Sequence, residues 1–457
     1  MGPKPKGPQT GELFRQLLAE LINEKHPLVK LAELIDWRVF EREWAPLFPS
    51  KRGRPATPPR LVAGLLYLQH TFACSDEALL GTWVENPYWQ HFCGETYFQH
   101  EAPIDPSSLT RWRKRIGEAG VEWLLTVTIN AARKAQVIKA ASLEKVIVDT
   151  TVMEKAIAYP TDSRLLERGR QHLVKLADRL GIKLRQNYNR QAPRLAGQVG
   201  RYAHARQTRR MHATLKKLRT VVGRVWRDID RQRSSVAPEQ TAQVASILAR
   251  VRRLLDQKPK DKNKLYSLHA PEVECIGKGK ARQPYEFGVK VTVTTTHREG
   301  LVVGMRSLPG NPFDGHTLGE AIEQVEILTE QKPQAVFVDK GYRGAKVPGI
   351  TIWRSGQRRG VTRRLKQDIR RRSAIEPMIG HMKNDGLLRR NWLRGSLGDA
   401  LHAVLCGAGH NLRMILRKLR LLRARILALL QTLSAFPSAV KNSPAPPRFA
   451  AEPIVQD

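Results

Sequence analysis

The sequence is poor in cysteine and has no long uninterrupted apolar run, and each shortage excludes a class of protein. Its four cysteines, at positions 74, 93, 275 and 406 of 457 residues, are widely scattered and form no CxxC pair. Neither a zinc ribbon nor a disulfide framework is therefore expected, and reduced, buried thiols are the better prediction. The most apolar stretch, 401–433, is broken by arginines such as Arg413 and Arg417, which predicts an amphipathic basic helix rather than a membrane span.

Acidic residues are also scarce relative to basic ones. The 78 Lys+Arg outnumber the 42 Asp+Glu, which leaves a formal net charge of +36. So large an excess of positive charge repels itself. It is most easily understood if the chain normally binds a polyanion such as nucleic acid. Charge alone equally fits a ribosomal or chromatin-like basic protein without chemistry. Because the N-terminus also lacks the apolar segment of a signal peptide, we expect a cytoplasmic, nucleoid-associated protein.

The pattern of apolar residues divides the chain into helical and strand-rich parts. Residues 10–135 read as helical, with one helix opening at Pro58-Pro59 and another at Asp105-Pro106, where Asp suits the N-cap and Pro the first helical position. Between the first two strands, residues 163–265 are strongly basic and helical in period. The sequence therefore predicts an α/β fold. The strand signals lie at 146–148, 287–296, 301–308, 335–338 and 350–353.

Two aspartates each follow an apolar run that is typical of a buried strand. Asp149 comes after residues 146–148, and Asp339 comes after residues 335–338. Side chains at the carboxyl ends of such strands reach a cleft at the edge of the sheet, where a carboxylate is poorly solvated unless a cation compensates it. Magnesium suits such oxygen ligands, and two adjacent sites suit in-line attack on phosphate. For either aspartate alone, a simple turn cap is at least as good an explanation.

A third carboxylate lies on a predicted helix between two cations. Arg372, Glu376 and Lys383 fall at i, i+4 and i+11, which places them on one helix face. Such a face can supply a last metal ligand while its cations hold the DNA backbone. An ordinary solvated face with i,i+4 pairing is the alternative.

Together these segments resemble the three catalytic blocks of bacterial DDE transposases. The blocks are Val-Ile-Val-Asp-Thr-Thr at 146–151, Val-Asp-Lys-Gly-Tyr-Arg-Gly at 338–344 and Arg-Ser-Ala-Ile-Glu-Pro at 372–377. The closest resemblance is to the insertion-sequence five family. Its tyrosine–arginine–glutamate–lysine signature maps onto Ile369, Arg372, Glu376 and Lys383, so the tyrosine position holds isoleucine here. Segments 310–316 and 53–115 are also similar to the family, and the resemblance covers most of residues 50–415.

The resemblance implies a ribonuclease-H-like core with a mixed sheet. Asp149 would lie on its first strand, Asp339 on its fourth and Glu376 on a following helix, and the three would be both catalytic residues and ligands of Mg²⁺ or Mn²⁺. It implies a helical N-terminal DNA-binding region at 1–135, a core in two parts at 140–162 and 266–420, and a basic helical insertion at 163–265. A tail at 435–457 is expected to be disordered. The insertion is a DNA-contacting arm, a dimerisation element or a solvated helical hairpin.

Further candidate residues lie around these blocks and near the N-terminus. Arg52 and Arg54 form an arginine–glycine–arginine–proline segment suited to a narrow minor groove, although a flexible linker explains it equally well. The helices at 59–85 and 106–120 are a candidate helix-turn-helix, with helical packing as its rival. The candidate DNA-binding residues are Arg372, Lys383, Arg52, Arg54, Arg111, Arg113, Lys114 and Arg115. The candidate accessory residues are Asp314, His316 and His381, for which turn-forming or structural roles explain the positions nearly as well.

The function that we predict is DNA transposition by two-metal catalysis. The enzyme would bind element ends, hydrolyse phosphodiesters with water and join the freed 3′-hydroxyl to target DNA. Double-stranded DNA is the expected partner, and bringing two ends together implies a homodimer or a larger assembly. The alternatives are a metal-dependent nuclease without strand transfer and a non-catalytic DNA-binding regulator derived from a transposase.

Overall fold

The computed structural model describes residues 16–47, 56–279, 281 and 283–434. Its N-terminal part is a set of helices gathered around buried aromatic and aliphatic side chains. They are α1 (Leu18–Leu21), α2 (Pro27–Leu34), α3 (Arg38–Trp44), α4 (Pro59–Phe72), α5 (Asp76–Glu85), α6 (Pro87–Phe92) and α7 (Pro106–Lys134). The predicted helix starts at Pro59 and Pro106 are confirmed, and Asp105 accepts a hydrogen bond from the backbone N–H of Ser107 as the N-cap of α7.

The helix expected at 59–85, the first of the candidate helix-turn-helix, is interrupted at residues 73–75 and forms two helices, α4 and α5. Nearly every residue of α4 is buried, because α3, α5, α7 and α15 (Gly395–Ser434) all pack against it. A helix so largely buried cannot itself enter a major groove, so α4 is excluded as a recognition helix, and reading by the helix at 106–120 stays a prediction. Helix α7 also bends sharply at Gly117, whose φ of +65° is accessible to glycine at little cost.

The strand-rich part is one mixed sheet in the order β2-β3-β1-β5-β6, with β4 paired to β3 and β7 paired to β1. Its strands are β1 (Lys145–Lys155), β2 (Glu274–Gly277), β3 (Tyr285–Thr296), β4 (Val302–Leu308), β5 (Ala335–Val338), β6 (Thr351–Arg354) and β7 (Arg390–Asn391). Strand β1 runs antiparallel to β3 and parallel to β5, and β5 runs parallel to β6. Helices α12 (Asp314–Thr329), α13 (Arg363–Arg371) and α14 (Ile375–Asn384) complete this part.

Two expectations about the strands were wrong in detail. Strand β1 does not end at Asp149 but continues to Lys155, because β3 pairs with it along its whole second half, as far as Glu154. Asp339 follows the fifth strand in the sequence rather than the fourth, since the short strand β2 is added at the edge of β3.

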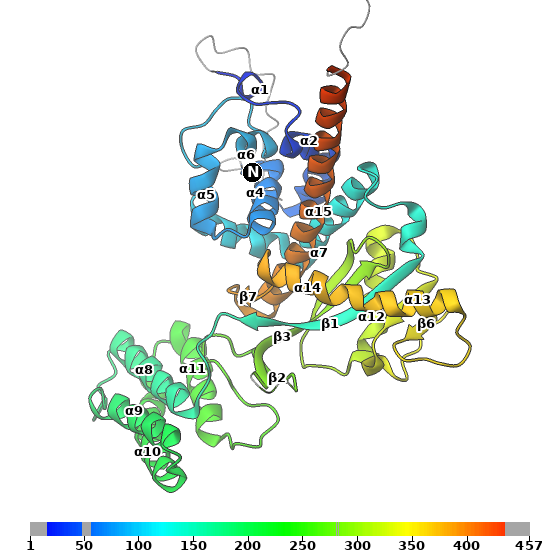
Figure 1. Ribbon diagram of the computed structural model, residues 1–457. Coiled ribbons are helices and arrows are strands. Elements are labelled where there is room, and N and C mark those ends of the chain that lie inside the picture. Colours follow the sequence, from blue (N-terminus) through cyan, green and yellow to red (C-terminus); the bar gives the residue numbers. More distant parts are fainter. Residues whose placement is uncertain (1–15, 48–55, 280, 282, 435–457) are drawn as a thin grey trace, which may run out of the picture.

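The predicted basic insertion folds as four helices that stand away from the sheet (Figure 1). They are α8 (Asp162–Leu180), α9 (Gln191–His204), α10 (Thr208–Arg231) and α11 (Pro238–Asp256). Their apolar faces form a core of their own. The N-terminal helices, by contrast, share one continuous core with the sheet.

Helix α15 links the two regions of this larger core. It packs against α4 and α7 on one side and against β4 on the other, and it rises from the sheet past the N-terminal helices (Figure 1). Among the described residues, no helix is both long and apolar enough to cross a membrane.

Candidate active site

The pairing of β1 with β5 places two of the predicted carboxylates side by side. In this parallel pair Ile147 lies opposite Phe337, and continuing the register by two residues puts Asp149 opposite Asp339. Neighbouring strands lie about 4.8 Å apart, so both side chains leave the sheet at the same point. Asp149 Oδ1 accepts a hydrogen bond from the backbone N–H of Thr150 at 2.8 Å, and Asp339 Oδ1 accepts one from the backbone N–H of Gly341 at 2.8 Å.

The third carboxylate is joined to this pair through Arg372. Arg372 Nη2 donates to Asp149 Oδ2 at 2.6 Å, and its Nη1 donates to Glu376 Oε1 at 3.4 Å. Arg372 belongs to a short 3₁₀ turn between α13 and α14, and Glu376 is in the first turn of α14. The i,i+4 spacing therefore does bring a cation and a carboxylate together, across a change of helix type.

The charges of the neighbouring residues act on the pKa of Asp149. Burial raises the pKa of Asp149, and the negative charges of Asp339 and Glu376 raise it further, while Arg372 acts in the opposite direction. The side chain of Asp149 is 14% exposed, whereas that of Glu376 is 65% exposed. The site is therefore a carboxylate cluster with one buried member and one member open to solvent.

A fourth carboxylate, Asp314, lies at the same place. A Cβ atom on Gly341 would be 3.0 Å from Asp339 Oδ1 and 3.2 Å from Asp314 Oδ2, so the two carboxylates face the same glycine. Asp314 begins α12, and its Oδ1 accepts hydrogen bonds from Thr150 Oγ1 and Lys290 Nζ, both at 3.1 Å. Among the three candidate accessory residues, Asp314 is the one that lies among the carboxylates.

Sequence reasoning missed Lys290. This lysine interrupts the apolar run of β3, and its Nζ donates to the carbonyl oxygen of Pro312 at 2.7 Å as well as to Asp314. It thereby fixes the loop that precedes α12. An isolated charge within a strand of β-branched residues was the available signal, but only the pairing of β3 with β1 shows which site it faces.

The donor set suits a hard divalent cation. Asp149, Asp339 and Glu376 offer only carboxylate oxygens, which Mg²⁺ and Mn²⁺ prefer, and Asp314 can add another. The carboxylate oxygens of these residues do not all lie within 4.8 Å of one another. Arg372 instead bridges two of them, so its guanidinium supplies the positive charge that a bound cation would share or replace.

The other candidate residues near the site have different surroundings. Lys383 is half-buried on α14, on the same helix as Glu376. His381 is exposed and its Nδ1 lies 2.6 Å from Oδ2 of Asp385, the C-cap residue of α14. His316 is exposed and packs edge-on against Phe313. Ile369, at the tyrosine position of the signature, is buried in the larger core.

The N-terminal candidates divide into surface and interior residues. Arg111, Lys114 and Arg115 are exposed on α7. Arg113 is a correction, because its side chain is only 3% exposed and is paired with Asp76 at 2.6 Å. It also donates to Gln69 Oε1 at 2.7 Å, so it fastens α7 to α4 and α5 instead of facing DNA. Arg52 and Arg54 lie outside the described residues.

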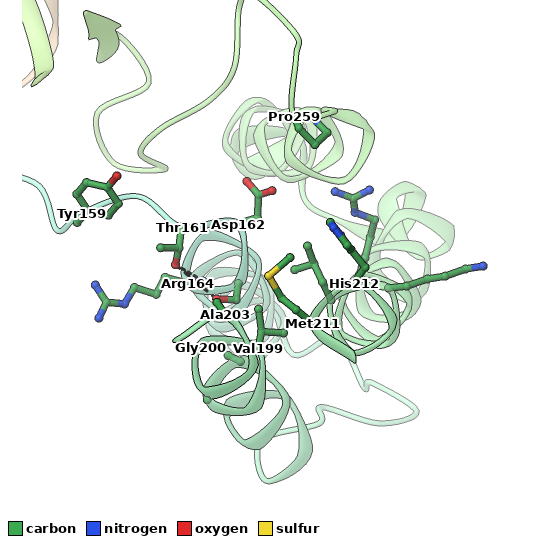
Figure 2. Close-up of a pocket in the computed structure, with 16 residues that line it drawn as sticks. Tyr159, Thr161, Asp162, Arg164, Val199, Gly200, Ala203, Met211, His212 and Pro259 are labelled. Atoms are coloured by element: carbon green, nitrogen blue, oxygen red, sulfur yellow. Dashed lines mark hydrogen bonds between the residues drawn. The ribbon is translucent and has the colours of Figure 1, made fainter. Parts of the chain in front are cut away.

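A large cavity, of about 1140 Å³, lies in the insertion rather than at the carboxylates. Figure 2 shows Val199, Gly200 and Ala203 of α9 facing Met211 of α10 across it, with Arg164 and His212 nearby. None of the three catalytic candidates lines this cavity. Its lining mixes small and apolar side chains with basic groups, the hydroxyl groups of Tyr159, Thr161 and Ser163, and the carboxylate of Asp162.

Comparison with known proteins agrees with the geometry. Residues 16–115 match a family described as a transposase domain (DUF772), and residues 227–408 match the transposase DDE domain. An uncharacterised protein of Rhizobium meliloti, ORF8 in the nfe locus, is 50% identical over 206 residues, which are 45% of this chain and 99% of that protein. No solved structure matches the chain. With the DDE match spanning Asp339 and Glu376, and Asp149 on the strand beside them, the chain belongs to the bacterial DDE transposases.

Proposed function

We propose that this transposase is catalytically competent: it cuts DNA at the ends of a mobile element and joins the freed 3′-hydroxyl to target DNA. The observation that carries the proposal is the meeting of three carboxylates from distant segments: Asp339 lies beside Asp149 across the β1–β5 pair, and Arg372 links Asp149 to Glu376. A chain that only bound DNA would have no need to hold carboxylates together at a surface meant for phosphates.

We further propose a ribonuclease-H-like core and membership of the insertion-sequence five family. The order β4-β3-β1-β5-β6 supports the first, since three antiparallel strands are followed by two parallel ones with a carboxylate on the central strand. The spacing of Arg372, Glu376 and Lys383 supports the second.

The roles of the residues follow from their contacts. Asp149, Asp339 and Glu376 would hold two divalent cations, Mg²⁺ or Mn²⁺, which when bound activate the attacking oxygen and stabilise the departing one. Arg372 orients Asp149 and Glu376 and neutralises part of their charge. Lys290 and Thr150 hold Asp314 beside Asp339. Lys383 and the exposed arginines of α13 are suited to binding DNA phosphates.

DNA contact by the insertion is part of the same proposal. Residues 163–265 contain 27 Lys+Arg and 7 Asp+Glu, a net charge of +20. Arg201, Arg206, Arg209 and Arg210 are all exposed where α9 meets α10, and no described carboxylate lies within ion-pair distance of them. The division into an N-terminal DNA-binding region, a two-part core and an arm-like insertion is proposed on this basis. A homodimer or larger assembly is proposed because two element ends must be joined.

The test is cleavage and strand joining on a supercoiled plasmid that carries the native element ends, with Mg²⁺ or Mn²⁺. We compare the wild type with Asp149→Asn, Asp339→Asn and Glu376→Gln, and use Glu323→Gln on the exposed face of α12 as the matched control. We expect joined products from the wild type and the control, and a loss of at least about 10³-fold in each site variant, while DNA binding persists.

Other outcomes distinguish the alternatives. Cleavage without joining would favour a metal-dependent nuclease. DNA binding without any cleavage by the wild type would favour a regulator derived from a transposase. Site variants that cleave as fast as the wild type would show that the carboxylates have been wrongly assigned.

A further inference from the structure

A second cluster of potential metal ligands lies away from the carboxylates, between α4 and α15. His70 of α4 and His402 and Cys406 of α15 each offer one ligand atom, and these three atoms lie within 4.8 Å of one another. The three residues are 2%, 0% and 3% exposed. Among the described residues this is the one group of three or more His, Cys, Asp or Glu side chains that is so compact.

Each histidine has one ring nitrogen that is hydrogen-bonded to a backbone carbonyl and one ring nitrogen that has no hydrogen-bond partner. His70 Nδ1 lies 3.1 Å from the carbonyl oxygen of Leu66, and His402 Nε2 lies 2.9 Å from that of Leu387. A carbonyl only accepts hydrogen bonds, so these nitrogens carry the ring protons. The remaining atoms, His70 Nε2 and His402 Nδ1, are buried and have no hydrogen-bond partner. Metal-binding histidines have this same arrangement, with one nitrogen anchored to a carbonyl and the other presented to the ion.

Both imidazoles of the cluster are neutral, as metal-binding histidines must be, whereas the thiol has to lose its proton to become a ligand. Burial lowers the pKa of His402 to about 4 and lowers that of His70 well below its usual value, so both rings are neutral and can act as ligands. Burial raises the pKa of Cys406 to about 12, while the charge of Arg413 acts in the opposite direction. Binding an ion would release the thiol proton to solvent and leave a thiolate as the third ligand.

The backbone is shaped to bring the two helices together at this point. A Cβ atom on Gly409 would overlap the carbonyl oxygen of His70. Arg413 Nη1 donates to that same oxygen at 2.7 Å. His402 is also held edge-on between His70 and Trp392, so its ring orientation is fixed on both sides.

We propose that His70, His402 and Cys406 form a structural site for a transition-metal ion that prefers nitrogen and sulfur ligands, Zn²⁺ or Cu⁺. Two imidazoles and one thiolate match both ions. Zn²⁺ would take a fourth ligand from outside the cluster, whereas Cu⁺ would be neutralised by the single thiolate. In either case the ion ties the N-terminal helices to α15.

The test begins with the metal content of the full chain, expressed in medium containing both zinc and copper and purified without chelator. We expect about one ion per chain in the wild type, and almost none in His70→Gln, His402→Gln and Cys406→Ser. Cys74→Ser and His410→Gln, which alter a cysteine and a helix α15 histidine outside the cluster, should keep the ion, as should Asp149→Asn at the carboxylates. Finding zinc or finding copper supports the site and identifies the ion.

A second measurement does not depend on the variants folding. Wild-type protein stripped of metal and titrated with Co²⁺ should develop a thiolate-to-cobalt charge-transfer absorption, and its thermal unfolding midpoint should rise. The proposal is overturned if the wild type carries no more zinc or copper than Cys406→Ser and shows no such absorption. It is equally overturned if all three cluster variants bind the ion as the wild type does.

Discussion

Arg372 is the residue on which the charge balance of the carboxylate cluster depends. It donates to Asp149 and to Glu376, and it is the strongest influence opposing the rise in the Asp149 pKa caused by burial. A guanidinium in this position both orients the carboxylates and competes with a cation for them. These two effects can be separated by substitution.

Replacing Arg372 with glutamine should tighten metal binding while slowing cleavage. The substitution removes the competing positive charge, so we expect Mn²⁺ to bind several-fold more tightly, measured by calorimetry. It also releases Asp149 and Glu376 from their positions, so cleavage should fall about 10²-fold. Glu323→Gln, on the exposed face of α12 and outside the carboxylate cluster, is the control and should change neither quantity. Weaker Mn²⁺ binding in Arg372→Gln would show that the arginine supports the metal site instead of competing with it.

The Asp76–Arg113 pair gives a prediction about stability and its dependence on pH. Burial alone would raise the pKa of Asp76, but hydrogen bonds and charge from Arg113, with a hydrogen bond from Gln69, hold it below its usual value. Asp76→Asn would leave Arg113 buried without its anion and should cost about 2–4 kcal/mol of unfolding free energy. Chemical denaturation measures this loss, with the exposed Glu77→Gln as control.

The sign of the pH effect follows from the lowered pKa. The pair contributes its full stability above the unfolded value of 3.8, and this contribution is lost as the pH falls through the lower, folded pKa. The difference between the wild type and Asp76→Asn should therefore shrink in strong acid. A difference that stayed constant down to pH 2 would mean that the pair is not what stabilises this contact.

Single residues were predictable where a local pattern marked them. Asp149 and Asp339 each follow an apolar run in the sequence, and Glu376 lies on a predicted helix face. The structure places the three near one another, and their catalytic role stays a proposal. Arg113 was mistaken for a surface residue because of its charge, although its position four residues after Leu109 and three before Ile116 places it on the apolar face of the helix. Its partner Asp76 lies 37 residues away in the sequence.

At the scale of elements, the pairing of β1 with β3 determines where Asp149 lies. Gly288 lies opposite Glu154 in this pair, and a Cβ atom on Gly288 would overlap the carbonyl oxygen of Met153. Gly288→Ala should therefore push the two strands apart and cost about 1–3 kcal/mol. Gly319→Ala on α12, where a Cβ would meet nothing within 4 Å, should be neutral or stabilising by up to about 1 kcal/mol.

Thermal unfolding of the two glycine variants measures the difference. If Gly288→Ala unfolds at the same temperature as the wild type, β1 and β3 do not approach as closely as described. The comparison is informative because both changes add one methyl group, and only the surroundings differ.

Most elements could be predicted, but their ends could not. The helices α4, α7 and α12 and the strands β3 to β6 were expected from periodicity and capping residues. Strand β1 was expected to stop at Asp149, since polar residues follow, yet residues 150–154 also pair because β3 offers partners for them. Strand length is thus set by a neighbour more than 100 residues away, which local pattern does not reveal.

For the molecule as a whole, the insertion should make DNA binding depend on salt. Replacing Arg206, Arg209 and Arg210 together with glutamine should lower the slope of log affinity against log salt by about 2–3, since each lost phosphate contact contributes about 0.9. Filter binding at several salt concentrations measures this slope. Arg252→Gln is the control, because Arg252 is already paired with Asp256 at 2.7 Å. An unchanged slope in the triple variant would leave dimerisation as the better role for the insertion.

The division of the chain into cores was only partly visible in the sequence. The insertion was recognisable by its basic, helical composition, and it does have a separate core. The merging of the N-terminal helices with the sheet was not predictable, because it rests on contacts of α15 with α4, α7 and β4 across more than 90 residues.

This shared core has a geometric consequence for DNA. Because α15 packs against both the N-terminal helices and the sheet, the two cannot rotate independently without opening the core. If the N-terminal helices grip one stretch of an element end, the carboxylates then meet the duplex at a fixed distance and angle from that stretch. The spacing between the bound sequence and the cleavage site would then be fixed. Inserting one base pair between them would rotate the scissile phosphate by about 35° away from the carboxylates.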